Sequence, residues 1–226
     1  KSRLLFELWS TLDKDSTATR YWRQGRSLPY GEGVSFWALG EMVKAQAGIL
    51  ESDASDAAAE KLRTAVAAVV DDEVEAWWVL EHLRPLVGLG GPPQDAVDHR
   101  REAFGAWRRF FESLAEQYPL VLVFEDLHWA DDGLLDFVDH LVDWSSGVPI
   151  LVVCTSRPEL LERRPGWGGG KRSALTVSLS PLSDAETEQL LAGLLAEKTV
   201  QNGRAARLLA NAGGNPGLSN EEANTY

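Results

Sequence analysis

Residues 120–126 read LVLVFED, so five apolar residues, Leu120 to Phe124, are followed directly by Glu125 and Asp126. The run is continuous rather than alternating, which is typical of a strand covered on both faces in a parallel sheet. In open parallel sheets, ligands bind beyond the carboxyl ends of the strands. A carboxylate there can hold Mg²⁺, usually through water, and a second one can orient or deprotonate an attacking water. Taken alone, the pair is equally compatible with ordinary solvated acids in a turn.

The rest of the chain predicts further strands and many helices. Apolar runs at 150–155 and 175–179 predict two more strands, and a weaker alternation predicts one at 17–24. Helical spacing or helix-forming composition predicts helices at about 3–12, 35–48, 55–70, 74–87, 95–117, 132–144, from 184 onward and at 204–212. The strand–helix–strand order of the second half predicts a parallel sheet with right-handed crossovers, and hence an α/β fold.

Two helix starts carry recognisable caps. Asp131 or Asp132 can cap the helix predicted at 132–144. Ser183, with Glu186 three residues later, forms a capping box before the next helix.

Composition and charge exclude several classes of function. The chain has 22 basic and 34 acidic residues and a net charge of −12, whereas binding along a nucleic-acid backbone requires clustered positive charge. No apolar run approaches the roughly 18–20 residues that span a membrane, and the first residues lack the apolar core of a signal peptide. We therefore expect a cytoplasmic protein with no membrane partner and no direct nucleic-acid binding by this segment.

The single cysteine, Cys154, excludes an internal disulfide framework and fits a reducing compartment. It lies in an apolar run, so we expect a buried side chain rather than a reactive thiol. The chain begins without a Met, and we expect it to be a piece of a longer protein.

Residues at two further places in the chain could contact a nucleotide. Lys1 and Ser2 open a helix, as do the last two residues of a phosphate-binding loop, where the Lys reaches the β- and γ-phosphates and the hydroxyl binds Mg²⁺. Thr155 and Arg157 follow the strand at 150–155, where a polar group could sense the γ-phosphate and a cation could contact the phosphates. Considered singly, each of these is more simply explained as an ordinary helix start or loop.

The order of these pieces resembles a known family, the AAA-type ATPase module of the STAND class. It looks closest to the module beside class III adenylate/guanylate cyclase domains and in large LuxR-type regulators. The resemblance is carried, in the family's order, by Lys1–Leu5 (KSRLL), Gly25–Gly33 (GRSLPYGEG) with Phe36-Trp37, Val121–Asp131 (VLVFEDLHWAD), Thr155–Leu160 (TSRPEL), Leu179–Asp184 (LSPLSD) and Gly214–Pro216 (GNP). The most specific of these is the stretch from Val121 to Asp131.

The resemblance implies a P-loop NTPase-like fold, a parallel sheet flanked by helices with the start of a helical lid. It implies ATP and Mg²⁺ as cofactors. By resemblance, Lys1 would contact the β- and γ-phosphates, and Ser2 and Glu125 would bind Mg²⁺. Asp126 would position or activate the attacking water. Thr155 would lie at the tip of the sensor strand, Arg157 would sense the γ-phosphate, and Pro216 would cover the adenine. Residues 1–182 would form the ATPase core, without its first strand and glycine loop, and 183–226 a partial helical lid.

The function implied is an ATP-binding regulatory module, a Mg²⁺-dependent nucleotide switch with slow hydrolysis. As an enzyme it would be an ATP hydrolase in the full-length protein, linked covalently to regulatory or cyclase domains, with self-association left open. The alternative is a non-catalytic ATPase-like scaffold in which the Trp-bearing helices at 74–87 and 100–111 bind protein partners.

Overall fold

The structure is a computed structural model that describes residues 2–14, 20–29, 36–90, 97–171 and 173–196. Its contacts divide the chain into two compact units, Lys1–Ala174 and Leu175–Tyr226. The first unit contains the sheet and the helices around it. The assignment of 1–182 as ATPase core and 183–226 as partial lid stays a prediction, and the helix predicted at 204–212 lies outside the described residues.

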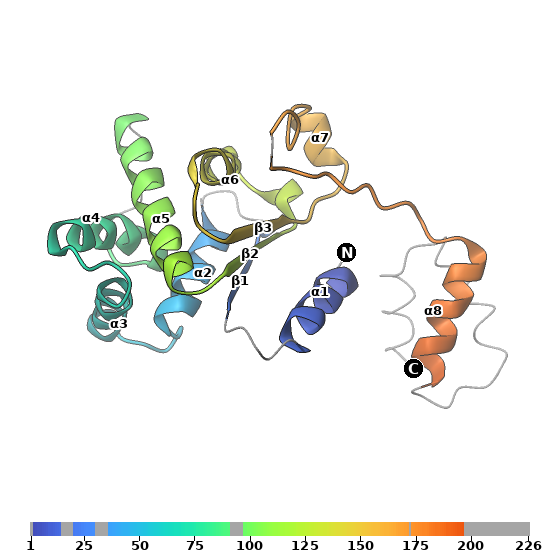
Figure 1. The fold of residues 1–226 in the computed structure, drawn as a ribbon, viewed down its shortest axis with the longest axis horizontal. Helices are drawn as coiled ribbons and strands as arrows, with labels where there is room; N and C mark the ends of the chain where they lie inside the picture. The colour runs from blue at the N-terminus through green and yellow to red at the C-terminus, as the bar shows by residue number, and fades with distance from the viewer. Residues whose placement is uncertain (1, 15–19, 30–35, 91–96, 172, 197–226) are drawn as a thin grey trace. The chain divides into compact units, whose positions relative to one another are not determined.

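The described part of the first unit contains three strands separated along the chain by helices, with α2 to α5 all lying between β1 and β2 (Figure 1). Its strands are β1 (Tyr21–Arg26), β2 (Leu120–Glu125) and β3 (Ile150–Cys154). Its α-helices are α1 (Ser2–Lys14), α2 (Trp37–Ala47), α3 (Ser55–Ala67), α4 (Glu73–Leu83), α5 (Val97–Gln117), α6 (Asp132–Trp144) and α7 (Glu159–Arg163). Two short 3-10 turns are η1 (Arg84–Val87) and η2 (Leu127–Trp129), and the second unit contributes α8 (Asp184–Ala196).

The three strands form one parallel sheet in the order β1-β2-β3. The register places Arg26 beside Glu125 and Phe124 beside Cys154. The predicted α/β fold, a parallel sheet flanked by helices, is therefore confirmed. The strand predicted at 17–24 is present as β1, with its bounds moved toward the carboxyl side.

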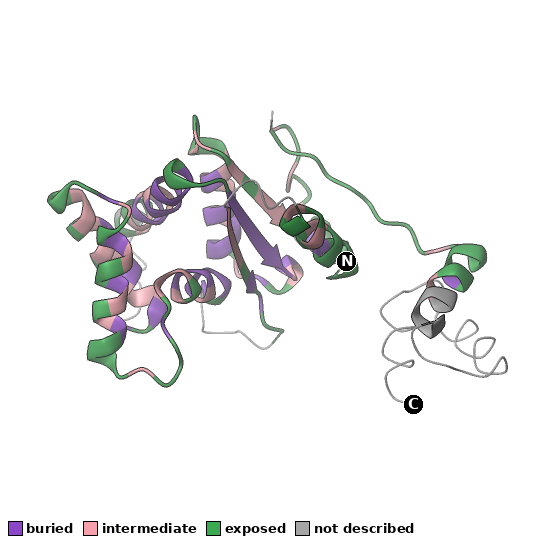
Figure 2. Cartoon of the chain, turned by 60° about the horizontal axis from the view of Figure 1, so that its bottom comes forward, coloured by how far each residue is buried: buried purple, intermediate pink, exposed green. Residues whose placement is uncertain are grey.

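The central strand β2 is buried on both faces, as its continuous apolar run predicts (Figure 2). Successive side chains of a strand point to opposite faces. Leu122 and Phe124 pack into the large core that α2, α3, α5 and α6 build, whereas Val121 and Val123 pack with Leu5 of α1 in a smaller cluster. Helix α1 therefore covers the face of the sheet opposite to the main core.

Helix α2 lies directly on β1 at Gly25. A Cβ atom at this position would lie 2.6 Å from the carbonyl carbon of Ala38 and 2.9 Å from its Cα. Any side chain on residue 25 would therefore collide with the backbone of α2.

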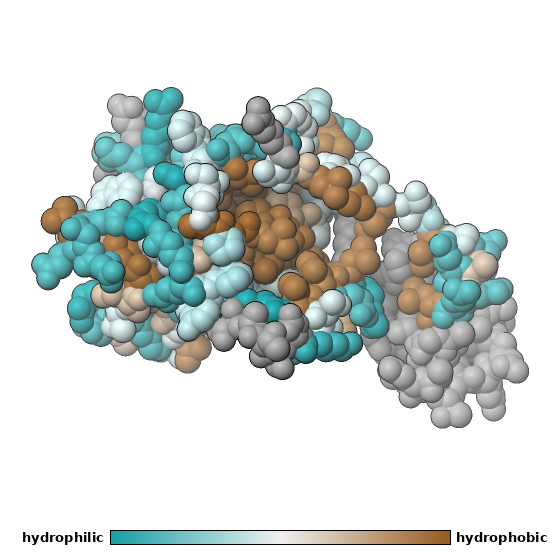
Figure 3. All heavy atoms as spheres, in the orientation of Figure 1, coloured by the Kyte–Doolittle hydropathy of each residue, from teal (hydrophilic) through white to brown (hydrophobic). Residues whose placement is uncertain are grey.

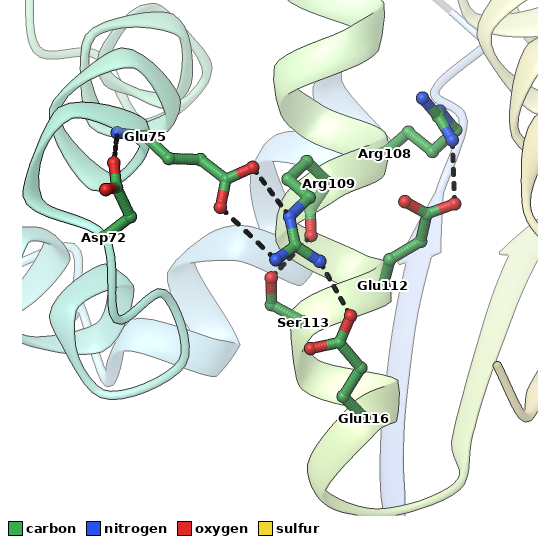
Figure 4. A network of polar contacts seen from close by, with 7 residues as sticks. All are labelled: Asp72, Glu75, Arg108, Arg109, Glu112, Ser113 and Glu116. Carbon is green, nitrogen blue, oxygen red and sulfur yellow. Dashed lines mark hydrogen bonds and ion pairs between the residues drawn. The ribbon is translucent and has the colours of Figure 1, made fainter.

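Helices α4 and α5 are joined by a network of charged side chains (Figure 4). Arg109 of α5 donates from Nε to Glu75 Oε1 at 2.9 Å and from one terminal nitrogen to Glu116 Oε1 at 2.7 Å. The hydrogen bonds that Glu75 accepts stabilise the charged guanidinium and raise the pKa of Arg109 above its ordinary value. Asp72 begins α4 by accepting the backbone N–H of Glu75 at 2.8 Å.

One predicted strand is absent, because residues 175–179 are described and form no strand. Leu175, Val177 and Leu179 are 87%, 68% and 51% exposed. An extended segment without a hydrogen-bonded neighbour has neither ladder bonds nor a packed face, so apolar composition alone does not make it a strand.

The expectation for Cys154 is confirmed only in part: its side chain has exposed surface, but desolvation raises the pKa of its thiol to about 12, so it is not a reactive thiol. Within the described residues β3 is an edge strand paired only with β2, and Leu151 is likewise 49% exposed. Figure 3 shows apolar side chains gathered beside the strands and α1 on the face drawn. The apolar run predicted the strand correctly, but the burial of an edge strand depends on neighbours that the run itself does not specify.

Both predicted caps are present. Asp131 Oδ1 accepts the backbone N–H of Leu134 at 3.0 Å and begins α6. In the second unit, Ser183 and Glu186 form the reciprocal capping box, with Ser183 N–H donating to Glu186 Oε2 at 2.8 Å and Glu186 N–H donating to Ser183 Oγ at 3.3 Å.

Replacing Asp131 with Ala is expected to lower the free energy of unfolding by about 2 kcal/mol. The carboxylate accepts two backbone N–H groups, because Oδ2 also accepts from Phe36 N at 3.3 Å, and the variant leaves both without this partner. The measurement is the urea midpoint of the purified protein. Asp132→Ala, one residue on and exposed, is the matched control, with a change below about 0.5 kcal/mol. Equal midpoints for the two variants would contradict this role of Asp131.

Candidate functional site

Glu125 is a buried carboxylate at the carboxyl end of β2, with 6% of its side chain exposed. Gln24 Nε2 donates to its Oε1 at 2.5 Å, and a terminal nitrogen of Arg26 lies 3.3 Å from Oε1 and 3.4 Å from Oε2. Both partners come from β1, because the parallel register aligns Arg26 with Glu125 and residues two apart share a face. A buried charge requires such partners, since without them it costs several kcal/mol.

Asp126 turns the chain out of the sheet. Its backbone is left-handed, with φ 57° and ψ 40°, a conformation that Asp tolerates better than most non-glycine residues. Its side chain is 38% exposed and its Oδ2 lies 3.5 Å from Arg26 Nε. The two neighbouring acids thus differ in environment: Glu125 is enclosed, and Asp126 is open to water.

Thr155 fastens this turn to the end of β3. Its Oγ1 accepts the backbone N–H of Asp126 at 3.2 Å, and its carbonyl accepts the N–H of Leu127 at 2.9 Å. A hydroxyl that accepts one hydrogen bond still has a hydrogen to donate. Thr155 is therefore brought together with the acidic pair, as the sequence predicts.

Arg157 is exposed two residues farther along the chain. Among the described residues, its guanidinium has no carboxylate within ion-pair distance. The carbonyl of Arg157 accepts the N–H of Leu160 at 3.2 Å, which places the residue at the entrance to α7. The side chain is a cation near the carboxyl end of the sheet that is available to an anionic ligand.

Ser2 is the exposed first residue of α1. Leu5, one turn later, packs on Val121 and Val123, which share their face of β2 with Glu125. Helix α1 and the Glu125 side chain therefore lie on the same face of the sheet. The hydrogen bonds of Glu125 that involve described residues come from Gln24 and Arg26 rather than from Ser2.

Two predicted site residues, Lys1 and Pro216, lie outside the described residues. Their roles on the phosphates and on the adenine stay predictions.

Sequence reasoning missed Gln24 and Arg26 as site residues. The signal available was positional: they end a strand that runs parallel to the strand carrying Glu125, and they precede a loop rich in Gly and Pro. Only the register shows that the two strands end side by side.

The donor atoms fit a hard cation that also binds phosphate. Glu125 and Asp126 offer carboxylate oxygens and Thr155 a hydroxyl, which suit Mg²⁺. No group of three or more His, Cys, Asp or Glu side chains within the described ranges could hold a metal by itself. Mg²⁺ commonly keeps several waters and binds one or two carboxylates together with substrate phosphates, so this donor set fits Mg²⁺ with a nucleotide and not a closed protein cage.

The acidic residues of α6 have a different role. Arg164 and Lys171, from the segment after β3, form ion pairs with four carboxylates of this helix. These pairs are Arg164 with Asp132 at 3.2 Å and Asp136 at 2.8 Å, and Lys171 with Asp139 at 3.1 Å and Asp143 at 2.6 Å. They attach the loop to the outer side of α6 and are separate from the acidic pair.

The helices proposed for a partner interface differ in exposure. Trp77 of α4 is 64% exposed, whereas Trp107 of α5 is 1% exposed and belongs to the core. Trp107 donates its indole N–H to the carbonyl of His82 at 2.7 Å, which ties α5 to α4. Trp107 is thus unavailable to a partner.

Nowhere in the described ranges does a helix combine the length and the apolar character needed to cross a bilayer.

Comparison with known proteins identifies a family. A family model described as AAA ATPase domain matches residues 1–153. The matched range includes α1, β1, β2 and the acidic pair, and it ends just before Thr155 and Arg157. No curated protein and no solved structure matches the chain.

Proposed function

Because the chain belongs to the AAA ATPase domain family, we propose that it is an ATP-binding regulatory module, a Mg²⁺-dependent nucleotide switch with slow hydrolysis. The observation that carries this proposal is the placement of Glu125 and Asp126, one enclosed and one open to water, at the carboxyl end of a central parallel strand. Ligands of open parallel sheets bind at this edge.

The two acids are suited to different tasks. Glu125 is enclosed and its Oε1 accepts a hydrogen bond from Gln24, so its position is fixed and its carboxylate would accept a cation or its waters. Asp126 is open to solvent and fixed through its backbone by Thr155, so it would orient or deprotonate an attacking water. When bound, Mg²⁺ supplies positive charge that offsets the developing charge on the phosphates.

The cationic and hydroxyl groups complete the assignment. Arg157 would contact the γ-phosphate, and Thr155 would donate its hydroxyl hydrogen to that phosphate or to the water. Ser2 with Lys1 would lie at the phosphates and Pro216 at the adenine. Catalysis of this kind depends on positioning and charge, with no covalent intermediate on the protein.

The switch would act by coupling the nucleotide to attached domains. We propose the STAND class and a cytoplasmic signalling protein, with regulatory or cyclase domains on the same chain and with self-association as an option. The support is the order of motifs, from Lys1-Ser2 through the acidic pair and Thr155–Arg157 to Gly214–Pro216.

The test is isothermal titration calorimetry of the full-length protein with ATP. Binding is expected with a Kd below about 1 mM in the presence of Mg²⁺, and it is expected to weaken about tenfold or more when EDTA removes the metal. Glu125→Gln, which keeps the size of the side chain and removes its charge, should lose most of this Mg²⁺ dependence. Absence of binding at millimolar ATP would refute the proposed function.

The alternative is a non-catalytic scaffold that uses the ATPase fold to bind proteins. It is favoured by exposed apolar side chains on α4, where Val74 is 75% and Trp77 is 64% exposed. Measuring phosphate release from ATP separates the two functions. A nucleotide switch should lose turnover when Asp126 is replaced, whereas a scaffold hydrolyses no ATP and the replacement should change nothing.

A further inference from the structure

Arg26 contacts both members of the acidic pair. Its terminal nitrogen lies 3.3 Å and 3.4 Å from the two oxygens of Glu125, and its Nε lies 3.5 Å from Asp126 Oδ2. These distances are longer than the roughly 2.7–2.9 Å of a tight charge-assisted hydrogen bond. The guanidinium therefore contacts two carboxylates at once through loose contacts and offsets one of their two negative charges.

The exposure of the three side chains is uneven. Arg26 is 55% exposed, while Glu125 is 6% and Asp126 38% exposed. The Arg26 head group can therefore move into solvent without breaking a packed core, whereas Glu125 cannot follow it. The contact is easily opened from the arginine side.

A divalent cation and the guanidinium compete for the same oxygens. The cation needs lone pairs of Glu125 and Asp126, and Arg26 lies against those lone pairs with a positive charge that repels it. The phosphates of a nucleotide would favour the cation over the guanidinium at these carboxylates. They add oxygen ligands for the cation, and they attract the displaced guanidinium.

We propose that Arg26 is a positioning residue that occupies the acidic pair when no nucleotide is bound and keeps divalent cations from binding there on their own. The divalent cation then binds together with the nucleotide, and Arg26 loses its contacts with the two carboxylates when the cation binds. This inference rests on the proposed function for its biological role, but the competition between Arg26 and a cation can be measured without nucleotide.

The experiment is Mn²⁺ binding to the full-length protein without nucleotide, with free Mn²⁺ counted by electron paramagnetic resonance. Arg26→Gln is expected to bind Mn²⁺ about tenfold or more tightly than wild type, because the competing charge is gone. Arg26→Lys keeps the charge but cannot contact both carboxylates with a planar fork, so its affinity is expected between the two.

The matched control is Arg23→Gln, which removes the same charge from the same strand. Arg23 donates to Gln46 Oε1 at 2.8 Å and does not contact the acidic pair. Its Mn²⁺ affinity should remain within about twofold of wild type, since this half-buried side chain points to the opposite face of the sheet from Arg26. Adding Glu125→Gln to Arg26→Gln should remove the gain, which locates the metal on the pair.

Equal Mn²⁺ affinities for Arg26→Gln and Arg23→Gln overturn the inference. If Arg26→Gln does not fold, Arg26→Lys provides the test. A Mn²⁺ affinity of Arg26→Lys no higher than that of the wild-type protein then overturns the inference. A wild-type protein that fails to bind ATP refutes the proposed function instead, and the order of Mn²⁺ affinities still tests Arg26.

Discussion

Replacing Gly25 with Ala is expected to lower the free energy of unfolding by about 3 kcal/mol or more. The new Cβ would lie 2.6 Å from the carbonyl carbon of Ala38 and 2.9 Å from its Cα, which are backbone atoms of α2. The strand cannot retreat, because β1 is paired with β2 along its whole length. Helix α2 cannot retreat either, because Leu39 and Met42 on it are fully buried in the core. A domain of marginal stability loses much of its folded population at this cost.

The measurement is chemical denaturation followed by circular dichroism. Gly166→Ala is the matched control, since a Cβ there meets nothing within 4 Å. That variant should be neutral or slightly stabilising, by up to about 1 kcal/mol, because alanine restricts the unfolded chain more than glycine does. If the two variants unfold at the same denaturant concentration, α2 does not lie against Gly25 as described.

Replacing Asp126 with Asn is expected to lower the rate of ATP hydrolysis by about 10²–10⁴-fold while ATP binding changes little. The amide cannot accept the proton of an attacking water, whereas Glu125 and the cation site remain. Asn is the informative substitution because residue 126 has a left-handed backbone, which Asn adopts readily. Alanine would add backbone strain and mix a folding effect with the chemical one.

Hydrolysis is measured as phosphate release at saturating ATP and Mg²⁺, and binding by calorimetry. Asp132→Asn is the control, the same change on an exposed carboxylate that pairs with Arg164. It should retain wild-type turnover. Turnover of Asp126→Asn equal to wild type would argue against a general base at this position and in favour of the scaffold.

Much of the fold could be predicted because its signals are local. The continuous apolar run predicted the central strand β2. The capping box of Ser183 and Glu186 predicted a helix start, and the structure shows both of its reciprocal hydrogen bonds. The strand predicted at 175–179 failed for a complementary reason. An apolar run records a tendency to be buried, but a strand exists only where another strand supplies hydrogen bonds.

The candidate site divides in the same way. The sequence pointed to Glu125, Asp126 and Thr155, and the structure brings these three together at one edge of the sheet. It did not indicate Gln24 and Arg26, because the contact between Arg26 and Glu125 joins positions 99 apart in the chain. Such a contact depends on which strands pair and in which register, and a one-residue slip would turn Arg26 to the other face.

The sequence by itself determined the class of this protein. The central apolar strand and the helix caps are local signals that depend on neighbours a few residues away, and the order of motifs along the chain indicated the ATPase family. Tertiary structure alone decided that α2 rests on Gly25 and that Cys154 lies on an open edge. It also decided that Arg26 contacts both members of the acidic pair. The physical reason is that burial, close backbone approach and the pairing of charges depend on distances between segments, which hydrophobic pattern and helix propensity do not encode.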